Sequence, residues 1–119
     1  AALKRATSAL AGGSPSLVLR LAETVLAATP DRVEAMILRA RALAALGRFD
    51  EAVTAIRRAL SRNPGDPRAH FALGETHRVL GERDKARAAF ERFLAIVDPS
   101  DADLVRDVAF ARRYVEKHP

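Results

Sequence analysis

Residues 33–66, which decide the fold, read VEAMILRARALAALGRFDEAVTAIRRALSRNPGD. Apolar residues recur every three to four positions on both sides of Gly47, which is the spacing of one face of a helix. Gly47 can adopt the left-handed conformation that ends a helix without steric cost, and Pro64 lacks the amide that a helix interior needs. The stretch therefore predicts two helices that fold back on each other as a hairpin.

The hairpin is repeated along the chain. Gly13, Gly47 and Gly81 stand 34 residues apart, and the same shift superimposes many further positions. These include Pro30 on Pro64, Leu26 on Leu60 and Leu94, Leu46 on Leu80, Asp50 on Asp84, Ala52 on Ala86, and Ala35 on Ala69. A period of 34 residues built from two helices is that of the tetratricopeptide repeat. The chain resembles this family over nearly its whole length.

The resemblance implies an all-α fold, a right-handed α-solenoid of antiparallel helix-turn-helix repeats with about seven helices. We expect one domain, 1–119, with a partial first repeat (1–32), a second repeat (33–66), a third repeat (67–100) and a capping helix (101–117). Small residues at the helix crossings, Ala40 with Ala52 and Gly74 with Ala86, allow close approach of the two backbones. Leu104, Val108, Ala111 and Val115 form the apolar stripe by which the last helix would cover the third repeat.

Helix starts are predicted from capping residues. Ser14 and Asp66 each precede a proline, and a capping side chain before a first-turn proline is a typical helix start. Asp31 and Ser100 each have an acidic residue three positions on, which is the pattern of a capping box.

Composition excludes several function classes. The 119 residues contain no cysteine, which rules out disulfides and thiolate metal sites, and we expect no cofactor. No apolar run reaches the roughly 18 residues of a membrane helix, so we expect a soluble protein of the cytoplasm or periplasm. The chain begins with Ala1 rather than methionine, which suggests a piece of a longer protein.

The net charge of +5 raises the question of nucleic-acid binding. However, 15 acidic residues are interleaved with the 20 lysines and arginines, and aromatic residues make up only 5% of the chain. This pattern is typical of a solvated helix surface, so nucleic acid is the disfavoured partner.

In the tetratricopeptide family the first helix of each hairpin lines a concave face that holds a peptide or helix. The corresponding positions are Glu34, Ile37, Leu38, Arg41 and Ala45 in the second repeat, Arg68, Phe71, Ala72, Glu75 and Arg78 in the third, and Lys4 and Thr7 in the first. Ile37 and Phe71 are equivalent apolar positions that could accept an amphipathic segment, and the arginines favour an acidic one. The alternative is that the apolar pair completes the packing between helices and the arginines are merely solvated.

One subgroup of the family captures a C-terminal carboxylate with Lys, Asn and Arg on successive first helices. This chain has Thr7 and Leu38 where that clamp has asparagine, and Ala72 where it has its final arginine; only Arg68 is a plausible stand-in. Binding of that kind is therefore disfavoured.

The histidines do not predict a metal or catalytic site. His70 and His77 lie two helical turns apart, about 10 Å, which is too far for one ion without a ligand between them. A partly buried, hydrogen-bonded histidine is the favoured interpretation. No nucleophile and base fall at compatible positions, and no phosphate-binding loop is present, so we expect no enzyme activity.

Phe110 and Tyr114 lie four residues apart on the capping helix, off its apolar stripe. We expect them to be partly exposed, which leaves two interpretations: they fold against Phe93, or they mediate a homo-oligomer contact.

The sequence leaves three functions open. A protein-interaction scaffold leads, ahead of a structural self-assembling repeat and a nucleic-acid-binding repeat.

Overall fold

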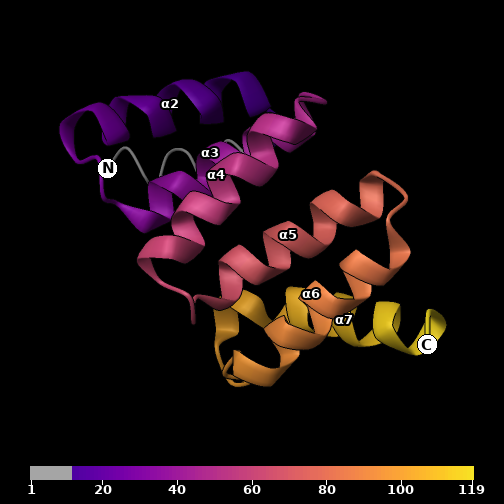
Figure 1. The fold of residues 1–119 in the computed structure, drawn as a ribbon. Coiled ribbons are helices and arrows are strands. Elements are labelled where there is room, and N and C mark those ends of the chain that lie inside the picture. Colours follow the sequence, from indigo (N-terminus) through magenta and orange to yellow (C-terminus); the bar gives the residue numbers. More distant parts are fainter. Residues whose placement is uncertain (1–11) are drawn as a thin grey trace. The chain divides into compact units, whose positions relative to one another are not determined.

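The computed structural model describes residues 12–119, which contain six α-helices, one 3-10 turn and no strand (Figure 1). The helices are α2 (Pro15–Ala28), α3 (Val33–Ala45), α4 (Phe49–Arg62), α5 (Pro67–Val79), α6 (Arg83–Ile96) and α7 (Val105–Lys117), with the 3-10 turn η1 at Ala102–Leu104. The first helix of the partial first repeat, with Lys4 and Thr7, would fall outside these residues. The chain divides into two compact units, unit 1 up to Pro64 and unit 2 from Gly65 to Pro119.

In unit 1, α3 packs between α2 and α4. Val18 and Ala22 on α2 are fully buried against Leu38 and Ala42 on α3. The predicted core positions on the other side of α3 are also buried. Met36, Ala40 and Leu43 on α3 and Ala52, Ile56 and Ala59 on α4 are at most 3% exposed.

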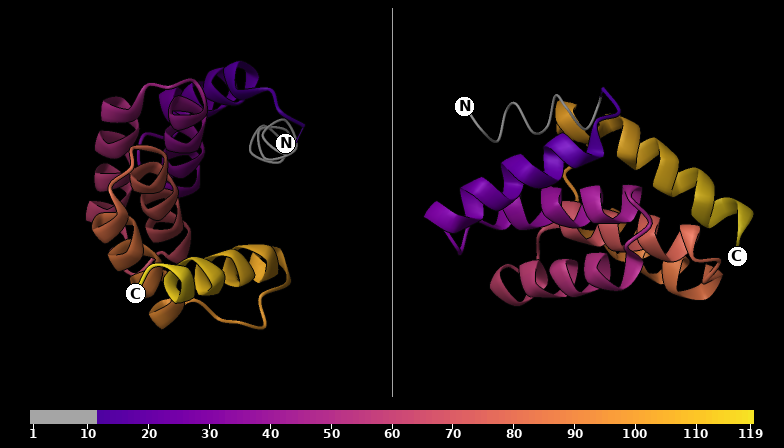
Figure 2. Two further views of the ribbon diagram at one scale, coloured as in Figure 1. Left: turned by 90° about the vertical axis from the view of Figure 1, so that its right-hand side faces the viewer. Right: turned by 90° about the horizontal axis from the view of Figure 1, so that it is seen from above.

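In unit 2, α5 and α6 form the second hairpin and α7 packs on it, as the two views of Figure 2 show. Phe71, Phe90 and Phe93 form the centre of its core, with ring centroids 5.0–5.4 Å apart for the pairs that include Phe71. Leu104 of η1 and Val108 and Ala111 of α7 are buried, as the stripe predicted, and Val115 is partly buried.

The glycine turns are confirmed. Gly47 and Gly81 both have a φ of +78°, a conformation in which a side chain would be strained. The amide after each glycine donates to a carbonyl five residues back, Arg48 to Leu43 at 2.8 Å and Glu82 to His77 at 2.9 Å. These bonds satisfy carbonyls that a helix end leaves free.

The capping predictions are confirmed only at Asp66, whose carboxylate accepts from the amide of Arg68 at 3.0 Å. Ser14 occupies its predicted place but makes no side-chain capping bond. Asp31 is wrong as a cap because α3 starts one residue later, after Arg32, and the carboxylate of Asp31 pairs with Arg62 at 3.0 Å.

Ser100 is also wrong as a cap. Its hydroxyl donates to Asp98 at 2.7 Å, and this bond lowers the pKa of the Asp98 carboxyl. Asp101 caps η1 instead by accepting from the amide of Asp103. The first turn of the expected closing helix is therefore 3-10, and its α-helical part begins at Val105.

Candidate functional site

The predicted binding residues of unit 1 lie on one face of α3. Glu34 is exposed, and its carboxylate lies 3.6 Å from Nε of Arg32. Ile37 is only 4% exposed and Arg41 is half-buried. Little apolar surface is therefore open at this face within unit 1, where charged groups flank a buried isoleucine.

The predicted binding residues of unit 2 follow one face of α5. Arg68 and Arg78 are exposed, Glu75 is half-buried, and Phe71 is 5% exposed. The Phe71 ring contacts those of Phe90 and Phe93 and lies 6.1 Å from that of Phe110 on α7. Phe71 thus belongs to the core of unit 2, while the charged side chains of α5 reach solvent.

The expectation of partial exposure on α7 holds for Phe110, which is 38% exposed. It is wrong for Tyr114, which is 9% exposed because its ring packs 5.0 Å from that of Phe90. The apolar face with which α7 contacts the hairpin is therefore larger than the predicted stripe, because it includes Tyr114.

His77 fits the packing interpretation of the histidines. It is 7% exposed, and its ring Nδ1 lies 3.0 Å from Oε1 of Glu82. An ionised carboxylate only accepts, so the ring N–H donates in this bond. The hydrogen bonds from His77 and Lys85 lower the pKa of the Glu82 carboxyl. Within residues 12–119, no three His, Asp or Glu side chains are grouped closely enough to hold a metal ion.

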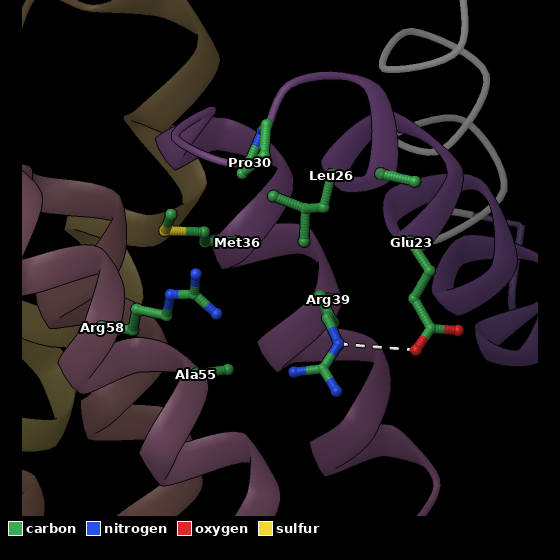
Figure 3. Close-up of a pocket in the computed structure, with 8 residues that line it drawn as sticks. Glu23, Leu26, Pro30, Met36, Arg39, Ala55 and Arg58 are labelled. Atoms are coloured by element: carbon green, nitrogen blue, oxygen red, sulfur yellow. Dashed lines mark ion pairs between the residues drawn. The ribbon is translucent and has the colours of Figure 1, made fainter.

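A pocket of about 320 Å³ opens within unit 1 between α2, α3 and α4 (Figure 3). Leu26, Pro30 and Met36 supply its apolar lining, and Glu23 and Arg39 stand beside it as an ion pair at 3.6 Å. The sequence interpretation missed this pocket because none of its lining residues is one of the concave-face positions named for the repeat. Its volume is at the lower end of the range of pockets that hold ligands.

The described part of the chain, residues 12–119, contains no helix long and apolar enough to cross a membrane. Its helical hairpins are those expected for the repeat, so the all-α fold class is confirmed.

Solved structures that share this fold include the following two. The type III secretion chaperone SycD of Yersinia enterocolitica, in complex with a peptide of the translocator YopD, matches with a TM-score of 0.80 at 12% identity, over 98% of this chain and 88% of that one. A thermophilic TPR protein of Thermus thermophilus matches with a TM-score of 0.76 at 23% identity, over 98% of this chain and 72% of that one.

Sequence comparison leads to the same fold. Protein CTR9 homolog of Arabidopsis thaliana is 37% identical over 95 residues, which are 79% of this chain. The chain spans only 9% of the length of that relative. The family model described as tetratricopeptide repeat matches twice, at residues 3–67 and 38–102. The chain therefore belongs to the tetratricopeptide repeat family.

Proposed function

We propose that this chain is a protein-interaction scaffold that holds a peptide or helical segment of a partner protein and catalyses no reaction. The observation that carries the proposal is the repeat fold itself, because a stack of helical hairpins presents long, solvent-facing helix surfaces. SycD, which has the same fold at low identity, holds a peptide of YopD, and this supports the proposal.

The binding surface that we propose is the first-helix face of each unit. On α3 it comprises Glu34 and Arg41 around Ile37, and on α5 it comprises Arg68, Glu75 and Arg78 around Phe71. Because the two apolar side chains are about 5% exposed or less, charged groups carry the contact. Guanidinium groups pair bidentately with carboxylates, which favours an acidic or amphipathic segment.

A nucleic-acid ligand fits this surface less well. Proteins that track single strands present several aromatic side chains on which bases stack. In unit 2, the rings of Phe71, Phe90 and Phe93 are instead packed against one another and buried. A self-assembling repeat stays an alternative and predicts association without any foreign ligand.

The test is capture of partner proteins from an extract by the chain and by an Arg41→Glu, Arg68→Glu variant, with the captured proteins identified. We expect specific capture by the variant to be at least about tenfold weaker, because each change places a carboxylate opposite a carboxylate of the partner. Aspartate at Ile37 or Phe71 is unsuitable because a buried charge would unfold the unit.

The matched control is Arg57→Glu with Arg92→Glu. Both arginines are exposed on the second helices α4 and α6, and both variants lower the net charge from +5 by four. Equal capture by the parent chain and the Arg41, Arg68 variant would refute the proposed surface.

A further inference from the structure

A second pocket lies within unit 2, where the C-terminal ends of α5 and α7 meet the turn at Gly81. It has a volume of about 540 Å³, which is within the range of pockets that hold ligands. Four cationic side chains line it: Arg78 from α5, Arg83 from the start of α6, and Arg113 and Lys117 from α7.

These four cations lack carboxylate partners. Among the residues that the structure describes, none of the four forms an ion pair, and no acidic residue lines the pocket. At least six arginines and lysines elsewhere in residues 12–119 do form an ion pair, for example Arg48 with Glu51 at 2.8 Å. The pocket is therefore a local excess of positive charge in a surface that is otherwise mixed.

The floor of the pocket is aromatic. Phe110 is 38% exposed and stacks on the buried Tyr114 with an interplanar angle of 20°. The guanidinium carbon of Arg78 lies 5.3 Å from the centre of the Phe110 ring, so it covers part of that ring. An apolar side chain has a surface to contact here, with cations around it.

Grouped like charges oppose folding because they repel one another at close range. Unit 2 nevertheless gathers four of them without a counter-charge, around an aromatic ring that stays exposed. An unpaired group of cations beside an exposed apolar ring is what a binding site for an acidic segment requires.

We propose that this pocket binds an acidic segment of a partner protein in which carboxylates flank an apolar side chain. The apolar side chain lies on Phe110, and the carboxylates pair with Arg83, Arg113 and Lys117. Of the phenylalanine and tyrosine rings that line the pocket, Phe110 is exposed and Tyr114 is buried, and a single exposed phenyl ring suits one side chain better than a run of stacked bases. This proposal rests on the proposed function, because both assign a protein segment as the ligand. The pocket and the first-helix face have only Arg78 in common.

The probe is a short fluorescent peptide with a leucine between glutamates, measured by anisotropy at low salt. We expect binding to weaken by at least about tenfold in the Arg83→Glu, Arg113→Glu variant. The control variant Arg92→Glu, Arg106→Glu has the same net charge and changes two exposed arginines of unit 2 outside the pocket; we expect it to weaken binding by less than about twofold.

Thermal unfolding separates lost binding from lost structure. Because the pocket variant removes repulsion between cations, we expect it to unfold at the same temperature as the parent chain or higher. Loss of binding together with a clearly lower unfolding temperature would count against a binding role, since the arginines would then be structural.

Two altered peptides and an oligonucleotide test the chemistry of the ligand. Glutamine in place of the glutamates should abolish binding, and serine in place of the leucine should weaken it. Equal binding of either altered peptide would overturn the proposed ligand. If a single-stranded oligonucleotide binds more tightly than the peptide in the same buffer, the pocket would be assigned to nucleic acid. If the parent chain is a dimer and Phe110→Ser makes it a monomer, the pocket would be assigned to a second copy of the chain.

The first-helix face and the pocket of unit 2 can be refuted independently of each other. The Arg41→Glu, Arg68→Glu variant leaves all four pocket cations unchanged, so it should retain peptide binding. Retained capture of partners with no peptide binding would remove only the pocket proposal. Peptide binding with no effect of that variant on capture would remove only the first-helix face.

Discussion

Gly74 lies in the middle of α5, and the ring of Phe90 fills the space that a side chain at this position would need. A Cβ atom on residue 74 would lie 2.6 Å from Cε1 of Phe90 and 2.7 Å from its Cδ1. Phe90 is fully buried between Phe71 and Tyr114, so its ring has no room to move. The glycine is therefore retained for packing and not for a special backbone conformation.

Replacing Gly74 by alanine should destabilise the chain. Alanine in a helix interior gains about 1 kcal/mol over glycine, whereas overpacking a core costs about 1–3 kcal/mol. We expect the clash to dominate, with a net loss of about 1 kcal/mol in the free energy of unfolding in urea. In a Phe90→Leu background the cost of the alanine should shrink, and a Gly74→Ala chain more stable than the parent would contradict the packing interpretation.

Residue-level features were predictable from the sequence where a repeat position determines them. Small and large core positions such as Ala52 and Ile56 follow from the helical period, and Gly47 follows from the turn that it ends. The capping residues were less predictable. Asp31 and Ser100 had stronger partners in Arg62 and Asp98, and nothing in the local sequence shows which partner is preferred.

The hairpin turns are the elements in which the two repeats differ most informatively. In the second repeat, Arg48 binds Glu51 through two hydrogen bonds at 2.9 and 2.8 Å. At the equivalent positions of the third repeat, Glu82 binds Lys85 at 3.2 Å. The positive and negative residues have exchanged positions between the two repeats, and the ion pair is kept. Glu82 also accepts from the buried His77, which ties its turn to the core.

The lowered pKa of Glu82 gives the turn a defined pH dependence. A carboxyl whose pKa is lower in the folded state contributes stability that is fully present above its ordinary value, 4.5, and is lost as the pH falls through the folded value. Glu82→Gln should therefore lower the unfolding temperature slightly at pH 7 and reduce the further loss on acidification below about pH 4.5.

Glu116→Gln is the control for this prediction, because Glu116 is exposed on α7 and has no ion pair among the described residues. Scanning calorimetry between neutral pH and pH 3 provides the comparison. Parallel pH profiles for the parent chain and Glu82→Gln would show that the turn does not contribute to acid stability.

The binding surfaces were only partly predictable from the elements. Helical spacing placed Arg68 and Arg78 on one face of α5, where both are exposed. The pocket of unit 2 was not predicted because Arg113 and Lys117, which are neighbours on α7, meet Arg83 only when α7 packs on the hairpin. One signal was present in the sequence: Arg83 stands where the second repeat has Phe49.

At the scale of the whole molecule, the two units have different cores. Four of the five phenylalanines and the one tyrosine of the chain lie in unit 2. Among residues 12–119, the largest fully buried side chains are Phe90 and Phe93 in unit 2 and Leu43, Ile56 and Val18 in unit 1. Since the free energy of burial grows with apolar area, unit 2 should be the more stable unit. The sequence period predicts the hairpins of both units but not this inequality, which depends on which residues α7 covers.

Tyr114 makes this difference measurable, because the chain has no tryptophan and its one phenol ring is buried in unit 2. Tyrosine fluorescence and the tyrosine band of the near-UV circular dichroism therefore report on unit 2 alone, whereas far-UV circular dichroism reports on all helices. In a urea titration we expect the far-UV signal to begin to fall before the tyrosine signal. Coincident transitions would mean that the units unfold together. The unmodified chain thus carries its own spectroscopic label, placed where it follows unit 2 separately from the rest of the chain.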